Sequence, residues 1–297
     1  MKRTVILLSI VIAFWNVENF FDFRPDGTSD SELEFSATGA RHWSKRRFYA
    51  KCDGIAKTLL RLADQRGQLP DVIGLAEVEG RFALQQLTSQ TPLRKLDYRI
   101  VHFESHDTRG IDCALLYRSS RLRLLEARPE AIVSGPGDTI ATRDLLYCRF
   151  EDLGGDTLAV IVAHLPSKVG GDAAQPRRER ALQTLRDLAG STGCPTVCIG
   201  DFNEQADPRQ DLSPLRDLSL PLLDLGLGTI RYNGQWELID RSLVQDCPQA
   251  RMGIFDDPML CTRDATFGGV KPLRTYSGPR HLGGLSDHFP IWVEVSL

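Results

Sequence analysis

The sequence lacks any sign of a cysteine framework. Its seven cysteines are scattered, and no two of them form a Cys-x-x-Cys pair. An odd, dispersed set does not suit a disulfide network, and no second Cys or His pair completes a zinc site. Cys194 and Cys198 flank an apolar run that favours a strand, so we interpret them as core thiols. The cysteines favour reduced thiols and, weakly, an intracellular protein.

A strong excess of one charge is also missing. The 297 residues carry a net charge of −3, which gives no general attraction to nucleic acid or to an anionic membrane. A nucleic-acid substrate would therefore need a local basic groove. The chain contains no internal repeat, low-complexity tract or long linker, which predicts a single domain over residues 1–297.

No apolar run is long enough to cross a bilayer as a helix. The run at residues 4–13 follows Lys2 and Arg3, as in a signal peptide, but it continues into residues 14–19 without a polar spacer. Cleavage after Ala13 would remove most of the strand expected to carry Asn16. We therefore favour a buried first strand and a cytoplasmic protein, with a secreted or periplasmic protein as the open alternative.

Short apolar runs alternate with helical patterns along the chain. Ser44 is a candidate N-cap for a helix whose apolar residues, from Phe48 to Leu62, recur at helical spacing. Further helices are predicted at residues 81–90 and 177–188, and strands at 71–77, 98–103, 111–117, 145–150, 158–164, 196–200, 238–244 and 291–295. Runs that are apolar on both faces indicate an α/β fold in which packed sheets are covered by helices.

Polar side chains recur where these apolar runs end. Rigid strand ends are where α/β folds assemble sites, although an isolated Asp after a strand is usually a turn former. One residue of this kind would carry little weight, whereas their joint occurrence calls for a common reason. The residues are Asn16, Glu18, Glu77, His164, Asp201, Asn203, Asp240, Asp287 and His288.

Hydrolysis of a phosphate ester supplies such a reason. Mg²⁺, or Mn²⁺ in its place, prefers oxygen ligands and needs only one or two carboxylates besides substrate oxygens and water. The metal polarises the phosphoryl oxygen, a positioned base takes a proton from water, and Asn donors hold the phosphate without adding repulsive charge. The residue types at the strand ends match these needs.

The same segments resemble a known family. The residues from Trp15 to Asn19, with Glu77, Asp201-Phe-Asn203 and Ser286-Asp287-His288, follow the order of motifs in the endonuclease/exonuclease/phosphatase superfamily. Residues 109–117 and 164–168 resemble a bacterial subgroup related to AP endonucleases and to deoxyribonuclease- and sphingomyelinase-type enzymes. The resemblance implies a four-layer α/β sandwich, with two central mixed β-sheets flanked by helices and the site at one edge.

The resemblance also implies a metal site. Glu77 would be the principal ligand of the divalent cation, and Glu18, Asp287 and Asn16 would complete the site.

Catalytic roles are implied in the same way. Asp201 would position or deprotonate the attacking water, and Asn203 would bind the phosphate. His288 would contact the phosphate or act as a base, with Asp240 orienting its ring. His164 matches a histidine that lies near the scissile phosphate and acts as general acid in related branches.

Basic residues near these motifs are candidates for substrate binding. Arg109, Lys168 and Arg177 could contact phosphate, but a salt bridge or a solvated surface explains each of them equally well. The basic run at residues 41–47 leads into the predicted helix, so we interpret it mainly as helix surface, with substrate contact as the alternative.

These residues predict a divalent-metal-dependent phosphoesterase that hydrolyses phosphodiester bonds, with a nuclease preferred. The alternatives are a lipid or inositol-phosphate phosphoesterase, or a catalytically silent relative that binds phosphate. The expected partner is a phosphodiester substrate, with nucleic acid as one candidate. No stable protein partner is implied, so a monomer is expected.

Overall fold

Two six-stranded mixed sheets form the centre of the molecule. The computed structural model describes residues 9–24, 29–135, 137–167 and 175–297. The first sheet has the order β15 (Arg251–Ile254), β20 (Ile291–Val295), β1 (Ile10–Phe20), β2 (Val72–Val78), β4 (Asp112–Arg118) and β3 (Tyr98–His102). The second has the order β11 (Arg216–Asp217), β14 (Asp240–Gln245), β10 (Thr196–Asp201), β9 (Thr157–His164), β8 (Leu145–Asp152) and β5 (Leu122–Glu130).

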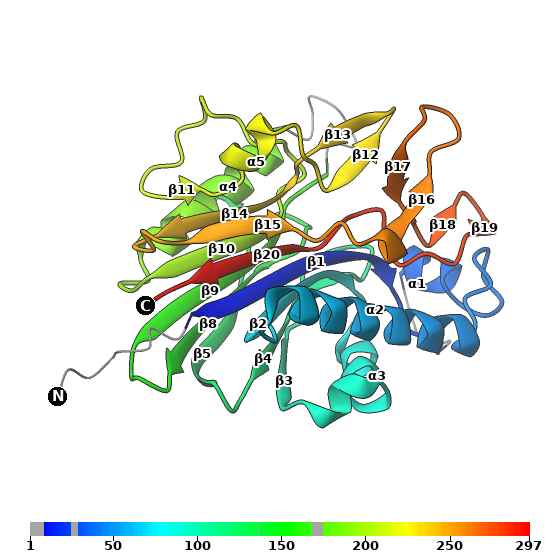
Figure 1. The fold of residues 1–297 in the computed structure, drawn as a ribbon, viewed down its shortest axis with the longest axis horizontal. Coiled ribbons are helices and arrows are strands. Elements are labelled where there is room, and N and C mark those ends of the chain that lie inside the picture. Colours follow the sequence, from blue (N-terminus) through cyan, green and yellow to red (C-terminus); the bar gives the residue numbers. More distant parts are fainter. Residues whose placement is uncertain (1–8, 25–28, 136, 168–174) are drawn as a thin grey trace.

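Helices cover the outer face of each sheet (Figure 1). Helices α2 (Lys45–Arg66) and α3 (Arg81–Gln90) pack on the first sheet, and α4 (Gln175–Gly190) packs on the second. The α/β sandwich expected from the sequence is therefore confirmed, while the single-domain expectation stays a prediction. The remaining elements are short: α1 (Asp30–Glu34), α5 (Leu220–Asp224), 3₁₀ turns at Pro92–Lys95 and Pro258–Leu260, and hairpins β6–β7 (Val133–Gly135, Asp138–Thr139), β12–β13 (Ile230–Tyr232, Gln235–Glu237), β16–β17 (Cys261–Arg263, Val270–Pro272) and β18–β19 (Tyr276–Ser277, Arg280–His281).

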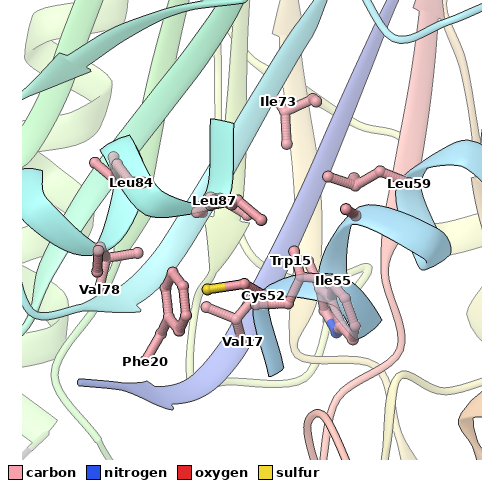
Figure 2. Packing of buried hydrophobic residues seen from close by; sticks show 14 of the residues in the cluster. Trp15, Val17, Phe20, Cys52, Ile55, Leu59, Ile73, Val78, Leu84 and Leu87 are labelled. Carbon is pink, nitrogen blue, oxygen red and sulfur yellow. The ribbon is translucent and has the colours of Figure 1, made fainter. Parts of the chain in front are cut away.

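Strand β1 is buried on both faces because its side chains alternate between two cores. Ile12 and Phe14 point into the layer between the sheets, whereas Ala13 and Trp15 pack beneath the helices. Figure 2 shows Trp15 beside the apolar face of α2. The expected buried first strand is confirmed for Ile10–Phe20, and residues 1–8 lie outside the described part. None of the described helices is long and apolar enough to cross a membrane.

Helix α2 begins after the N-cap that the sequence predicts. The hydroxyl of Ser44 accepts a hydrogen bond from the backbone of Arg47, and Gly67 adopts a left-handed conformation (φ 68°) that ends the helix. The apolar residues that were expected on one face are all buried: Phe48, Cys52, Ile55, Leu59 and Leu62. Burial of each large apolar side chain contributes about 1.5–3 kcal/mol. The helix therefore fixes the outer face of β1.

Strand direction brings the polar strand ends to one edge of the sandwich. Strands β1 and β2 run parallel, as do β9 and β10, so their carboxyl ends lie together within each sheet. Strands β14 and β20 run antiparallel to these pairs and begin at the same edge. Asp240 begins β14, opposite Asp201, so this strand starts two residues later than the predicted start at residue 238.

Candidate active site

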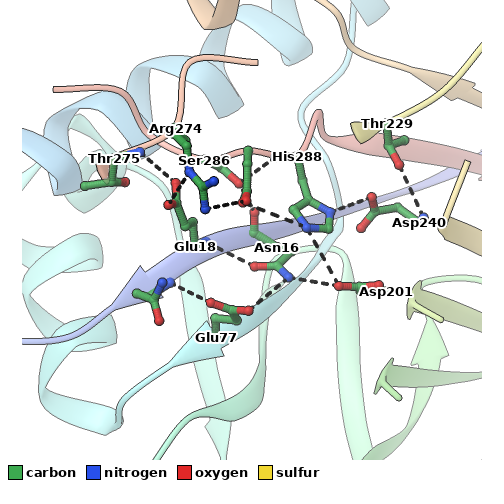
Figure 3. Close-up of polar contacts among 12 residues, drawn as sticks. Asn16, Glu18, Glu77, Asp201, Thr229, Asp240, Arg274, Thr275, Ser286 and His288 are labelled. Atoms are coloured by element: carbon green, nitrogen blue, oxygen red, sulfur yellow. Dashed lines mark hydrogen bonds and ion pairs between the residues drawn. The ribbon is translucent and has the colours of Figure 1, made fainter. Parts of the chain in front are cut away.

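Asn16 links the two sheets at this edge. Its amide Nδ2 lies 3.0 Å from Oδ2 of Asp201 and 3.5 Å from Oε1 of Glu77 (Figure 3). Its Oδ1 accepts a hydrogen bond from the backbone N–H of Glu18 at 3.0 Å. Asn16 is 1% exposed, so a neutral donor lies between two carboxylates that would otherwise repel each other.

A bulge at the end of β1 arranges the first group of acids. The β1–β2 register shifts between Asn16 and Phe20, and Glu18, Asn19 and Glu77 all adopt positive φ (47°, 53° and 62°). Such conformations strain non-glycine residues and concentrate at functional sites. The bulge lets the backbone N–H of Asn19 donate to Oε2 of Glu77 at 2.8 Å.

Arg274 lies between two of the predicted metal ligands. Its guanidinium is 3.4 Å from Oε1 of Glu18 and 3.0 Å from Oδ2 of Asp287. Burial, and then the charge of Asp287, raises the pKa of Glu18 to about 6. A cationic group therefore already occupies the space where these carboxylates face each other. Their hard oxygen donors fit Mg²⁺ or Mn²⁺, which favours a divalent cation at this position.

Three-residue groups of acids and imidazoles form elsewhere at the edge. Among the described residues, ligand atoms converge within 4.8 Å in the group Asp201, Asp240 and His288 and in the group His102, Glu104 and Asp112. Glu18, Glu77 and Asp287 do not form such a group, and the guanidinium of Arg274 contacts both Glu18 and Asp287.

Asp201 is held by hydrogen bonds at the end of β10. Its Oδ1 accepts the backbone N–H of Asn203 at 2.8 Å, while the amide of Asn203 donates to the carbonyl of Leu165 at 2.9 Å. Burial, partly offset by the charge of His288, raises the pKa of Asp201 to about 7. A carboxylate with this pKa can take up a proton near neutral pH, as a general base must.

His288 is fixed from both sides. Its Nδ1 lies 2.8 Å from Oδ2 of Asp240, and its Nε2 is 3.9 Å from Oδ2 of Asp201. Its backbone N–H donates to the hydroxyl of Ser286 at 3.0 Å, and its carbonyl accepts the indole N–H of Trp15 at 2.9 Å. Burial lowers the pKa of His288, but the charge of Asp240 outweighs it and the net pKa is raised well above 6.5.

His164 faces Asp201 from the neighbouring strand. Its Nε2 lies 3.6 Å from Oδ2 of Asp201, and its buried Nδ1 has no partner among the described residues. Burial, followed by the charge of Arg143, lowers the pKa of His164 well below 6.5. The ring is therefore neutral at neutral pH, and it has unused hydrogen-bonding capacity beside Asp201.

Of the three basic residues predicted to bind substrate, Arg109 and Arg177 lie in different parts of the molecule. Nη2 of Arg109 is 2.7 Å from Oδ1 of Asn19 and 3.8 Å from Oε2 of Glu77, so this side chain borders the acids. Arg177 is exposed on α4 and lines a separate surface cavity with Arg180. Lys168 lies outside the described residues.

Two further charged residues at the site were not predicted from the sequence. Arg274 lies between β17 and β18. These strands are only three and two residues long, too short to show the alternating pattern of a strand. Lys51 is buried on α2, where its ammonium donates to the carbonyl of Glu18 and to the hydroxyl of Thr275. The helical spacing did not predict that Lys51 would reach the site.

The chain belongs to the Endonuclease/Exonuclease/phosphatase family, whose sequence profile matches residues 11–297. No curated protein sequence matches the chain. This family membership agrees with the two-sheet sandwich and with the order of the motifs along the chain.

Solved structures with the same fold include enzymes with different substrates. D. rerio TDP2 complexed with a single strand DNA product is 17% identical, with a TM-score of 0.61, over 97% of this chain and 99% of that chain. The Bacteroides thetaiotaomicron mannosyl-6-phosphatase Bt3783 is 16% identical, with a TM-score of 0.59, over 97% and 100%. The human Nocturnin catalytic domain is 17% identical, with a TM-score of 0.56, over 97% and 93%. At these identities the likeness extends to the fold alone.

Proposed function

We propose that this protein is a divalent-metal-dependent phosphoesterase that hydrolyses phosphodiester bonds, preferentially in nucleic acid. The observation that carries the proposal is the position of Asn16, whose amide joins Glu77 of the first sheet to Asp201 of the second. A metal-binding acid and a proton acceptor are thereby held side by side. Phosphoryl transfer to water needs both.

Glu77, Glu18, Asn16 and Asp287 would hold Mg²⁺ or Mn²⁺. A bound cation of this kind supplies charge stabilisation at the phosphoryl oxygens and at the leaving oxygen. The oxygen-only donor set suits a hard cation, and the positive charge of Arg274 between Glu18 and Asp287 supports a cation-binding position there.

The chain's own residues would then carry out the hydrolysis. Asp201 accepts a proton from water, the water oxygen forms a bond to phosphorus, and the bond to the leaving oxygen breaks as that oxygen takes a proton from solvent. His288, which is cationic, and Asn203 hold the phosphoryl oxygens. His164 is neutral and would act as a hydrogen-bond donor instead of a general acid. A ring whose pKa is lowered well below 6.5 is a poor source of protons.

The preference for nucleic acid has weaker support than the chemistry. TDP2 from D. rerio, which shares the fold, has been captured with a single strand DNA product, whereas another relative in fold is a mannosyl-6-phosphatase. A sugar-phosphate, lipid-phosphate or inositol-phosphate ester is therefore the rival substrate, and a silent phosphate-binding protein is the rival function. We expect a monomer without a stable protein partner, which light scattering after size exclusion tests.

Hydrolysis of bis-p-nitrophenyl phosphate, plasmid DNA, single-stranded DNA, RNA, sphingomyelin, an inositol phosphate and mannose 6-phosphate tests the proposal. We expect turnover with Mg²⁺ or Mn²⁺ that a chelator abolishes, with nucleic acid cleaved fastest. Asp201→Asn and Glu77→Gln should abolish it, whereas Asp207→Asn, which alters a partly exposed acid paired with Arg209, should not. Turnover that survives chelation would contradict metal dependence, and no turnover on any substrate would contradict the proposed enzyme activity.

A further inference from the structure

A basic cavity lies beside the candidate active site. It has a volume of about 510 Å³ and is enclosed by the start of α2, Thr275 and the segment from His281 to Leu285. Its wall contains His42, Arg46, Arg47, Lys51 and His281, and no acidic side chain. Since the whole chain carries a net charge of −3, this concentration of basic side chains is local.

The charges of two of these cations are not neutralised nearby. Arg47 donates from Nη1 to the carbonyls of Arg41 and His42, at 2.9 and 2.8 Å, which positions the guanidinium without cancelling its charge. Within the described part of the chain, neither Arg46 nor Arg47 has a carboxylate partner. Burial, and then the charges of Arg47 and Lys51, lowers the pKa of His281, as a positive local potential would.

The position of these cations on the helix is unfavourable for stability alone. The first turn of α2 contains Lys45, Arg46 and Arg47 and no acid, although the N-terminal end of a helix carries partial positive charge. Cations at this end are repelled by the helix dipole, and an anion bound among them would reverse that repulsion. The arrangement therefore fits a ligand better than it fits a solvated helix surface.

The cavity shares a wall with the candidate active site. The hydroxyl of Thr275 accepts a hydrogen bond from Lys51 at 2.8 Å, and the backbone N–H of Thr275 donates to Oε2 of Glu18 at 2.6 Å. The neighbouring residue, Arg274, reaches Asp287. A group bound in the cavity would thus be adjacent to a phosphate bound at the acids.

We propose that this cavity binds a second phosphate group of the substrate, next to the phosphate that is cleaved. The inference rests on the proposed function and narrows its substrate class to esters with at least two phosphates. A nucleic-acid strand and a small polyphosphate ester share this chemistry. Both place a phosphate at some distance from the scissile bond, and both would be retained by Arg46 and Arg47.

Calorimetric titration with inorganic pyrophosphate in the presence of a chelator tests the site without catalysis. Removing metal leaves the acidic cluster repulsive to anions, so binding reports on the basic cavity. We expect Arg46→Gln to weaken binding by about tenfold and Arg46→Gln/Arg47→Gln to weaken it further. Arg46 is exposed, so Arg46→Gln is expected to fold. This single variant therefore tests the site even if the double variant does not fold. Lys57→Gln removes an exposed charge from the same helix, away from the cavity, and should bind as the unmodified protein does.

Short oligothymidylate and inositol bisphosphate, titrated in the same way, distinguish the two sources of phosphate. The tighter ligand should show the same dependence on Arg46. Absence of pyrophosphate binding, or equal binding by the unmodified protein and Arg46→Gln, would overturn the inference even in an active enzyme. Conversely, Arg46-dependent binding by a protein that hydrolyses no phosphoester would refute the proposed function and leave the anion site in place.

Discussion

Oδ2 of Asp240 lies 2.8 Å from Nδ1 of His288 and joins the two sheets through a buried ion pair. Asp240 begins β14 in the second sheet, and His288 precedes β20 in the first. The contact fixes the ring so that its other nitrogen faces Asp201, 3.9 Å away. It also keeps the imidazole protonated, because its pKa is raised well above 6.5 despite burial.

Replacing Asp240 with Asn should remove this charge and leave the ring misoriented. We expect kcat to fall by about a hundredfold or more for Asp240→Asn, with little change in KM. Steady-state kinetics measures the fall, and imidazole ¹⁵N shifts report the lost proton. Asp246→Asn, which alters an exposed acid just beyond the same strand, is the control. Equal kcat in the two variants would show that the ion pair is structural only.

Ser286 connects the backbones of the two strands that carry the site. Its buried hydroxyl donates to the carbonyl of Asn16 at 2.5 Å and accepts from the backbone N–H of His288 at 3.0 Å. Ser286→Ala leaves both groups unsatisfied, which should lower the free energy of unfolding by about 1–3 kcal/mol. Urea unfolding measures the loss, with Ser277→Ala as an exposed control. If the two variants are equally stable, the hydroxyl does not couple these strands.

Arg274 should compete with a divalent cation for Glu18 and Asp287. Its side chain is half exposed, so solvent screening limits the effect, and we expect Arg274→Gln to tighten Mn²⁺ binding by about three- to tenfold. Electron paramagnetic resonance of free Mn²⁺ measures this without turnover. Arg61→Gln removes an arginine that pairs with Asp257 instead. Weaker binding in Arg274→Gln than in Arg61→Gln would contradict the competition.

His164 should make the fold less stable in acid. Its pKa is lowered well below 6.5 by burial and then by Arg143. Below about pH 6.5 the unfolded chain takes up a proton on this ring that the folded chain does not, so stability falls as pH falls. Between about pH 7 and pH 5, the free energy of unfolding should fall in both proteins. The fall should be about 1–2 kcal/mol smaller in His164→Asn than in the unmodified protein. Urea unfolding with chelator present tests this, and parallel pH profiles would be the opposite result.

Much of the fold was predictable because its core elements have strong local signals. The helix from Lys45 to Arg66 follows from its N-cap and apolar spacing, and the central strands follow from runs that are apolar on both faces. The order of the strands was not predictable, since it depends on which runs pair across long separations. Strand β5, half exposed and rich in charged residues, gave no such signal.

Some residues of the candidate site were predictable from the sequence and others were not. Asn16, Glu77 and Asp201 could be identified because strand ends and family motifs mark them. Arg274 could not, because its contact with Glu18 spans 256 residues and it lies between hairpin strands two or three residues long. Nearness in sequence to His164 made Arg177 a candidate for substrate binding, but the structure places it on an exposed part of α4, beside a different cavity.

The position of a bound cation tests most directly whether distant acids and an amide converge on one metal. Crystals soaked in Mn²⁺ would reveal it by anomalous scattering. We predict a peak in contact with Glu77 and with one or more of Glu18, Asn16 and Asp287, adjacent to Asp201. No peak, or a peak only among His102, Glu104 and Asp112, would contradict the proposed metal site.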